Sequence, residues 1–348
     1  MEIKDIYKDV ASVANKVVNK GIDKVKDIAN SLDKVAEKAK DKYHALEETL
    51  RDIEVKRYSE CLTFELTEDK RGYRVVKCNE RVYDGKVIVP STYDGMPVVE
   101  LGNGAFAHNY RIYDEIVLPD TLEIIWHTAL SCLNNLKHIH IPKNVREIGR
   151  GAFFANERLQ AFTVDKENEH FCTIDGNLFT KDKTELVSYA IGKEDEFYYV
   201  PTETLKIRRN AFYRATLKKM VLNDNLLEIG NSAFDSSLIE EINLPPYLKR
   251  IDAQAFSGCK SLKGEMVIPA TVNVIEHEAF YDTGDLQLSF ESPTDFKVED
   301  AYGLHMIKKK KLMKSVLKNA KKANYFLKDK YHQFNWTAVR KSDKKVKE

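Results

Sequence analysis

Residues 136–153 read LKHIHIPKNVREIGRGAF, and this stretch contains the pattern that decides the fold. Its segment HIHIP, at 138–142, alternates polar and apolar residues, which is typical of a short strand with one buried face. The proline ends that strand because it cannot donate a hydrogen bond to a neighbouring strand. A second apolar pair, Val145 and Ile148, comes next. Then follow a glycine suited to a turn, at 149, and Ala-Phe, which supplies a small residue for a tight turn and a large one for the core.

The Ala-Phe pair recurs along the middle of the chain. It stands at 105–106, 152–153, 211–212, 233–234, 255–256 and 279–280, and Ala129-Leu130 fills the first gap. Successive alanines lie 24, 23, 59, 22, 22 and 24 residues apart, so the period is near 23 and the 59-residue interval holds one irregular long unit. A unit of this size cannot bury its own apolar face, whereas stacked units share one continuous core. The sequence therefore predicts a solenoid of about eight or nine stacked units.

The unit pattern LxxIxIPxxVxxIGxxAFxxC resembles the BspA-like, or Treponema-type, leucine-rich repeats, and NLPPYLKRIDAQAFSGC at 243–259 fits it as well. The resemblance implies an α/β solenoid, a leucine-rich-repeat array whose short parallel strands lie on the concave face. It also implies a repeat domain over 58–300, with a capping hairpin at 58–80 and an irregular long unit at about 160–200 that contains its own hairpin. Trp126-His127 replaces Ile-Gly and Asn223 replaces proline, which predicts local changes of geometry at these two places.

The open face of such a strand array is the expected binding surface. Residues between the buried strand positions form columns there, and their mix of aromatic, imidazole and acidic groups suits a protein partner. The alternative is that the face is only solvated. His138 and His140 point to the same side of a strand, but a pair without a third ligand predicts no metal site. The candidate contact residues on the concave face are Val117, His138, His140, Thr163, Tyr199, Val221, Glu241, Asn243 and Val267.

Residues 1–57 form a separate amphipathic segment. Apolar residues recur at alternating steps of three and four over 3–53, with a break near Gly21 and no proline, which predicts a long helix. A coiled coil or helical hairpin, with self-association through 3–53, is the first hypothesis for its role. Packing back on the solenoid is the second hypothesis, and a membrane-surface helix is the third, because the polar face carries both signs of charge.

The C-terminal segment 301–348 is strongly basic, with 15 basic and 3 acidic residues, while 58–300 carries a net charge of about −12. Its part 303–330 has a loose helical stripe, and the resemblance implies that the aromatic stretch around Trp336 forms a terminal cap. The lysines suit nucleic acid or anionic lipid, although Arg340 is the segment's single arginine. The other interpretation is that the segment neutralises the acidic repeats. The lysines are Lys308, Lys309, Lys310, Lys311, Lys314, Lys318, Lys321 and Lys322.

Catalytic and cofactor motifs are missing from the sequence. There is no phosphate-binding loop, dinucleotide fingerprint or nucleophile elbow, and His277-Glu278 lacks the second histidine of a zinc protease motif. The five cysteines are scattered, which favours reduced thiols, and no cofactor is expected. There is no signal peptide or transmembrane stretch, so the sequence as it stands predicts a cytoplasmic protein.

These observations together predict a non-catalytic protein–protein interaction module. The family resemblance implies an adhesion-like function, with a cell-surface or secreted location as the alternative to the cytoplasm. Binding of nucleic acid or an anionic membrane through the basic C-terminal segment is the alternative function.

Overall fold

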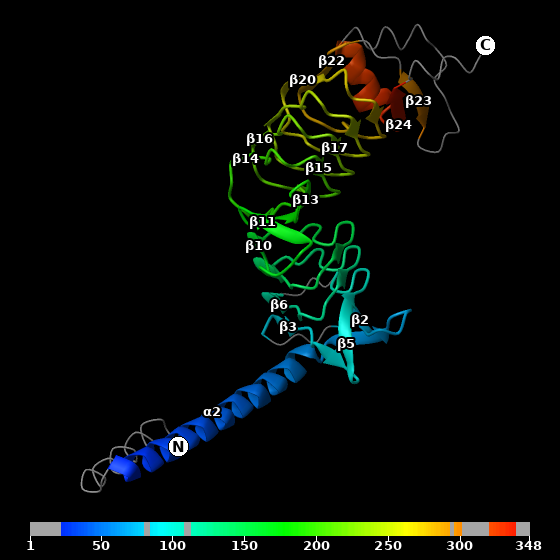
Figure 1. The fold of residues 1–348 in the computed structure, drawn as a ribbon. Coiled ribbons are helices and arrows are strands. Elements are labelled where there is room, and N and C mark those ends of the chain that lie inside the picture. The colour runs from blue at the N-terminus through cyan, green and yellow to red at the C-terminus, as the bar shows by residue number, and fades with distance from the viewer. Residues whose placement is uncertain (1–21, 80–83, 108–112, 293–295, 301–319, 339–348) are drawn as a thin grey trace, which may run out of the picture. The chain divides into compact units, whose positions relative to one another are not determined.

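The computed structural model describes residues 22–79, 84–107, 113–292, 296–300 and 320–338. The chain divides into two compact units, Met1–Arg57 and Tyr58–Glu348. The strands of the described residues all belong to the second unit, where most of them stack in two columns (Figure 1).

The first strand column contains the strand that precedes the proline position in each repeat. The nine strands that the structure describes there are β3 (Lys86–Ile88), β6 (Glu115–Val117), β8 (His138–Ile141), β10 (Ala161–Val164), β14 (Phe197–Tyr199), β16 (Lys219–Val221), β18 (Glu241–Ile242), β20 (Gly264–Ile268) and β22 (Leu286–Phe290). They pair in parallel within four sheets, β3-β6, β8-β10, β14-β16-β18 and β20-β22. Each strand places alternate side chains in the core, as in the pattern of β8, where His138 and His140 are exposed and Ile139 and Ile141 are buried.

The second strand column contains the strand that follows the proline position. Its strands are β5 (Met96–Leu101), β7 (Ile124–Ile125), β9 (Glu147–Ile148), β13 (Glu185–Ser188), β15 (Lys206–Ile207), β17 (Glu228–Ile229), β19 (Arg250–Ile251) and β21 (Val274–Ile275). They are parallel within two sheets, one ending at β9 and the other containing β13. The column is therefore interrupted between β9 and β13.

The core between the columns is built on the Ala-Phe pairs. Phe212, Phe234, Phe256 and Phe280 are fully buried and stack in register, with ring centroids 5.1, 5.1 and 5.5 Å apart. Each repeat thus covers the aromatic ring of the next one, which is how the stacked units share one core. The predicted solenoid of leucine-rich repeats is confirmed. The expected α/β character is wrong: the described repeats contain strands on both sides and no helix, so the array is a β-solenoid.

The turn around each Ala-Phe pair needs two left-handed residues. One directly precedes the alanine and the other comes four positions later, with φ between 51° and 66° in six consecutive repeats. Glycine adopts this conformation without strain, whereas β-branched residues such as Thr128 do so at a cost. The pairs are Thr128 and Cys132, Gly151 and Ala155, Asn210 and Arg214, Ser232 and Ser236, Gln254 and Gly258, and Glu278 and Asp282.

The N-terminal end of the array is closed by a hairpin. Strands β1 (Leu62–Leu66) and β2 (Tyr73–Cys78) are antiparallel, and β2 then pairs in parallel with β5. The short strand β4 (Thr92–Tyr93) adds to the other end of β5. The first repeat is thus covered by backbone that belongs to no repeat.

The irregular long unit contains three antiparallel strands. Strand β11 (Phe171–Ile174) pairs with β12 (Asn177–Thr180), and β12 pairs with β13. The strand β13 then continues the second column through its parallel ladder with β15. The hairpin expected in this unit is present as β12 and β13.

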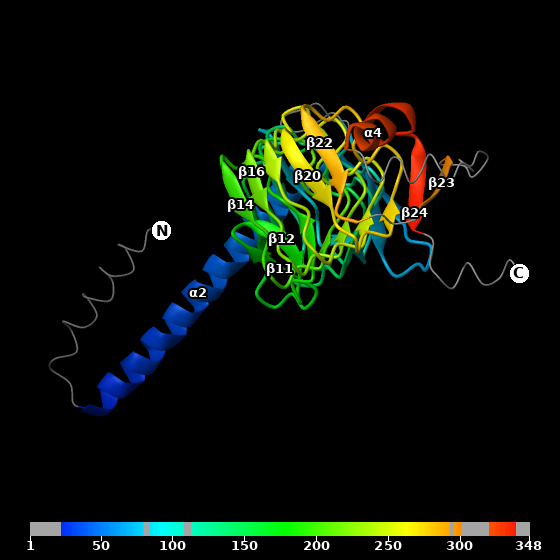
Figure 2. The same ribbon diagram turned by 90° about the horizontal axis from the view of Figure 1, so that it is seen from above.

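The C-terminal end is closed by β24 (Phe334–Ala338), which pairs antiparallel with both β21 and β23 (Phe296–Asp300). Trp336 in β24 is 1% exposed. Figure 2 shows α4 (Ala320–Asn324) beside β22, where the Asn324 side chain accepts a 2.7 Å hydrogen bond from the Leu288 amide. A π-helical turn, Tyr325–Lys330, connects α4 toward β24 and buries Phe326 and Leu327.

The described part of the first unit is a helix, α2 (Ile22–Ser59), whose last two residues belong to the second unit. The helix is rich in Lys, Asp, Ala and Glu and free of proline. Tyr43, Leu46, Leu50 and Ile53 on it are between 57% and 60% exposed. Within the described residues α2 has no partner helix, so the predicted coiled coil or helical hairpin is not supported. Residues 1–21, which contain the start of the predicted heptads and Gly21, lie outside the described part of the chain.

Candidate functional site

The candidate contact residues lie on one face, the solvent-exposed side of the first strand column, which we call its outer face. Strands β6, β8, β10, β14, β16, β18 and β20 each supply at least one of them, and Asn243 directly follows β18. All are exposed because they occupy the strand positions that alternate with the buried ones. The residues are Val117, His138, His140, Thr163, Tyr199, Val221, Glu241, Asn243 and Val267.

The strand ladders place several of these residues next to one another. His140 lies opposite Thr163, with Nδ1 and Oγ1 3.0 Å apart, and Tyr199 lies opposite Val221. Between Thr163 and Tyr199 the irregular unit separates two sheets of the column. The candidate face is therefore divided into a polar part around β8 and β10 and an apolar part around β14 to β20.

The apolar part of the face has an aromatic centre. Phe197 and Tyr199 contact each other edge to face with centroids 4.2 Å apart, and they are 38% and 66% exposed. Val221 and Val267 continue the exposed apolar surface over the following strands. A shallow hollow of 450 Å³ lies over β16, β18 and β20, and its walls include Phe197, Val221 and Val267. Exposed apolar clusters of this kind are typical of interaction sites.

Charged residues surround the aromatic centre and pair across the strands. Lys219 and Glu241 face each other in the ladder with a 3.1 Å ion pair, and Lys218 lies 3.3 Å from Glu196. An apolar centre with a polar rim is the anatomy of protein interfaces. Phe197 belongs to this site and is absent from the predicted set; it stands two positions before Tyr199, on the same strand face.

The second strand column carries a different surface, which the sequence did not single out. A hollow of 560 Å³ is lined by residues from Ile148 to Glu276 along this column. Its walls hold ion pairs between Lys206 and Glu228 at 2.9 Å, between Arg208 and Glu185, and between Arg250 and both Asp252 and Glu276. In the sequence, this surface could have been recognised from the charged residues on either side of the buried isoleucine of the second strand, as at Lys206 and Arg208 around Ile207.

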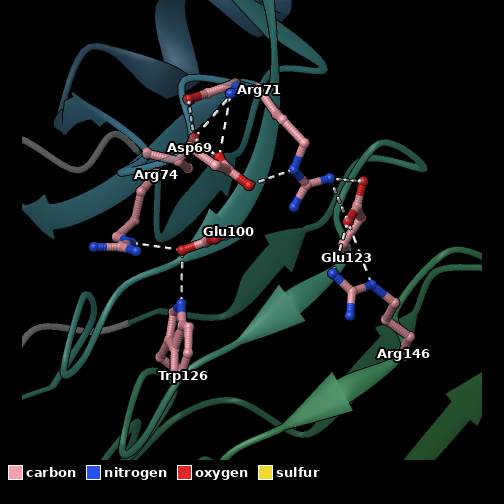
Figure 3. A network of polar contacts seen from close by, with 9 residues as sticks. Asp69, Arg71, Arg74, Glu100, Glu123, Trp126 and Arg146 are labelled. Atoms are coloured by element: carbon pink, nitrogen blue, oxygen red, sulfur yellow. Dashed lines mark hydrogen bonds and ion pairs between the residues drawn. The ribbon is translucent and has the colours of Figure 1, made fainter.

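At the N-terminal end, the same column contains a network of charged residues (Figure 3). Glu100, only 5% exposed, accepts hydrogen bonds from Arg74 Nε at 2.6 Å and from the indole nitrogen of Trp126 at 2.7 Å. Glu123 pairs with Arg71 at 3.1 Å and with Arg146 at 3.2 Å. Trp126, which departs from the repeat pattern, therefore satisfies a buried carboxylate.

Asn223, the second departure, satisfies backbone carbonyl groups. Its side-chain amide donates to Pro201 O at 2.7 Å and to Thr204 O at 2.9 Å. These bonds join two successive repeats at a position where proline would only end the strand.

The relation to known proteins follows from the repeats. A family model described as the BspA type leucine-rich repeat region matches residues 99–191 and 195–300, in six copies, which is more than half of the chain. The chain belongs to the BspA-type leucine-rich repeat family.

Solved structures of similar proteins come from several bacteria. The pneumococcal vaccine antigen PcpA is 32% identical, with a TM-score of 0.55 over 59% of this chain. The present chain spans 50% of that PcpA chain. A leucine-rich cell surface protein from Faecalibacterium prausnitzii is 17% identical, with a TM-score of 0.45 over 67% of this chain and 94% of its own. No curated protein matches the chain.

The remaining predictions concern other parts of the BspA-type protein. Within its described residues, no group of three or more His, Cys, Asp or Glu side chains is arranged to hold a metal ion, and no helix is long and apolar enough to cross a membrane. The five cysteines are free thiols, with Cys61, Cys78 and Cys259 buried. Lys308 to Lys311, Lys314 and Lys318 lie outside the described residues, whereas Lys322 is exposed on α4.

Proposed function

We propose that this BspA-type array is a non-catalytic, adhesion-like module that binds a protein partner through the outer face of the first strand column. The observation that carries the proposal is an exposed cluster in which Phe197, Val221 and Val267 line a 450 Å³ hollow and Tyr199 contacts Phe197. The cluster lies on hydrogen-bonded strands, so the backbone that carries it is held in place before a partner arrives. A partner that covers it therefore loses little conformational entropy on binding.

The cluster also has the composition of a binding hot spot. Tyrosine is among the residues that contribute most to protein interfaces, and the removal of one such anchor costs about 2 kcal/mol or more. Tyr199 is the most exposed aromatic of the cluster and has the largest area to bury. The paired charges at the rim, such as Lys219 and Glu241, exclude water around the contact rather than provide most of the affinity.

We place the partner at a cell surface. The likeness to PcpA supports this location, because PcpA is a vaccine antigen and an antigen of this kind must be accessible to antibodies. The location in the cytoplasm, which the sequence predicts as it stands, gains no such support.

A panel of purified, immobilised extracellular and cell-surface proteins tests the main proposal. We expect a partner whose affinity falls at least tenfold with Tyr199→Ala, while Tyr247→Ala leaves it unchanged. Tyr247 is a matched control because it is 58% exposed and lies outside the strands. Binding should persist from 50 to 500 mM salt, since the cluster is apolar.

The alternative function, binding through the basic C-terminal segment, predicts the opposite dependence on salt. Binding to nucleic acid or anionic lipid falls steeply with salt because it depends on counterion release. Replacing Lys308, Lys309, Lys310 and Lys311 by glutamine should abolish such binding and leave β24 in place. If these four substitutions remove all binding and Tyr199→Ala removes none, the proposal for the first strand column is wrong.

Self-association through residues 3–53 is a second candidate function, and α2 carries the observation that favours it. Tyr43, Leu46, Leu50 and Ile53 are exposed at steps of three, four and three residues, which is the spacing of a helix-pairing stripe. The occupant that fits this stripe is the same helix of a second copy. Light scattering of the full chain should show a dimer, and Leu46→Glu with Leu50→Glu should give a monomer. A monomeric full chain would refute this candidate.

A further inference from the structure

The second strand column contains two arginines in the same repeat position of adjacent turns. Arg150 and Arg209 each stand two residues before the alanine of an Ala-Phe pair, on either side of the irregular unit. The turns that carry them are neighbours in space, although they are 59 residues apart in the chain. Phe154 and Tyr213 of these turns contact each other with ring centroids 4.2 Å apart, and Arg208 Nη1 lies 3.5 Å from Ile148 O.

Both arginines line the hollow of 560 Å³ and a second hollow of 520 Å³ next to it. The two hollows join at the arginines and form one groove. Their shared residues are Arg150, Gly151, Phe154, Arg209 and Asn210. Gly149 and Gly230 in its walls let neighbouring turns pack closely, because a Cβ atom at either position would lie 2.7 Å from a backbone atom of the preceding turn. The groove lies where the second column is interrupted between β9 and β13.

The charges of the groove are unevenly matched. Every carboxylate in its walls has a polar partner among the described residues: Glu185 with Arg208, Glu228 with Lys206, Asp252 and Glu276 with Arg250, and Asp235 with the Ser236 hydroxyl. Of the five basic wall residues, Arg150 and Arg209 have no carboxylate partner in the described part of the chain. Among the residues that the structure describes, Arg209 Nε donates to Asn210 Oδ1 alone, at 3.2 Å. Like charges side by side in a stacked array are unfavourable until an anion is placed between them.

Further donors and an aromatic surface adjoin the two arginines. His127 occupies the same repeat position one turn earlier, and its Nδ1 accepts a 2.9 Å hydrogen bond from the Arg150 amide. A neutral His127 therefore carries its proton on Nε2, where it is a donor. Phe154 and Tyr213 border the same groove. The wall thus offers donors for an oxygen anion next to an apolar contact.

We propose that this groove is a second binding site, which takes an extended peptide segment whose carboxylate bridges Arg150 and Arg209 and whose apolar neighbour contacts Phe154 and Tyr213. Guanidinium groups pair with carboxylates through two parallel hydrogen bonds. The five carboxylates of the wall disfavour a dense polyanion such as a sulfated glycan, which would place many negative charges against them. The site is on the opposite column from Tyr199 and does not depend on the function proposed for that face.

The probes are two capped peptides, Gly-Gly-Phe-Asp-Gly-Gly and Gly-Gly-Phe-Asn-Gly-Gly, together with inorganic sulfate and a heparin hexasaccharide. Binding to the full chain is followed by the side-chain NMR signals of the arginine Nε–H groups. We expect the Asp peptide to bind at least tenfold more tightly than the Asn peptide and to shift the signals of Arg150 and Arg209. Arg150→Gln and Arg209→Gln should each weaken binding at least fivefold, and the control Arg158→Gln should not, because Arg158 is exposed outside the groove.

Four results would overturn the proposal. Equal affinity for the Asp and Asn peptides would exclude the carboxylate contact. Equal binding of sulfate and the Asp peptide would indicate a small-anion site only, and tighter binding of the hexasaccharide would indicate a glycan site. A structural role for the arginines is checked by thermal unfolding at low salt, where Arg150→Gln should leave the midpoint unchanged or raise it, because it removes a like charge. A lowered midpoint would show that Arg150 stabilises the fold and would also overturn the proposal.

Discussion

Replacing Phe234 by alanine perturbs the aromatic stack on which the solenoid depends. Phe234 is fully buried and lies between Phe212 and Phe256, with each ring centroid 5.1 Å away. Removal of a buried phenylalanine side chain costs about 3–5 kcal/mol. Its site has packed rings on both sides, so the cavity cannot collapse easily, and we expect a loss of about 4 kcal/mol. This is a large part of the total of about 5–15 kcal/mol that stabilises a typical domain.

The assay is urea unfolding followed by tryptophan fluorescence. The two tryptophans report on different parts of the array, because Trp126 directly follows β7 in the first sheet and Trp336 lies in the same core cluster as Phe234. Repeat arrays gain stability from contacts between neighbouring units. In a Trp126→Phe background, the remaining Trp336 should report the full loss. In a Trp336→Phe background, Trp126 should report a smaller loss.

The control for this experiment is Tyr247→Ala, at a side chain that is 58% exposed. We expect it to change the free energy of unfolding by less than about 0.5 kcal/mol. If Phe234→Ala lowers the stability reported by Trp336 by less than about 1 kcal/mol, the stacked rings are not what holds the repeats together.

Three further predictions concern single positions. Thr128→Asn should stabilise the fold by about 1 kcal/mol, because Thr128 is β-branched at a φ of 52° and asparagine, as at Asn210, tolerates this conformation better. An unchanged or lower midpoint of thermal unfolding would contradict this. Asn168→Ala should cost about 3 kcal/mol, because Asn168 is 1% exposed and makes four hydrogen bonds to backbone groups, and a loss below about 1 kcal/mol in urea unfolding would count against that bonding. Burial raises the pKa of Cys259 to about 12, so the thiol stays protonated in the folded chain. The resulting contribution to the free energy of unfolding is present below about pH 8.5 and is lost as the pH rises toward 12. At pH 8 a thiol reagent should therefore label Cys259 only after unfolding, and labelling of the native chain would show that this core is open.

The repeat architecture was predictable because each of its elements leaves a periodic mark. The alternation in HIHIP fixes the exposed positions of β8, and the Ala-Phe spacing fixes which rings stack. Tyr199 and Val221 were predicted to share a column for the same reason, and the ladder places them opposite each other. Whether this face binds a partner remains a prediction, since periodicity reports burial and not recognition.

Other features depend on contacts that have no local pattern. The heptad spacing around Leu46 predicts a helix-pairing stripe, but spacing alone does not supply the second helix, and the described residues contain none. The groove at Arg150 and Arg209 forms only because the irregular unit leaves two turns in contact across 59 residues. Trp126 reads as a departure from the repeat until its contact with the buried Glu100 is known.

Hydrogen exchange of the full chain, with and without a bound protein partner, tests the central claim most directly. If the first strand column is the binding face, the partner should slow the exchange of amides in β14, β16, β18 and β20, most strongly near Tyr199 and Val221. Protection confined to α2, to residues 301–348 or to the second strand column would contradict it.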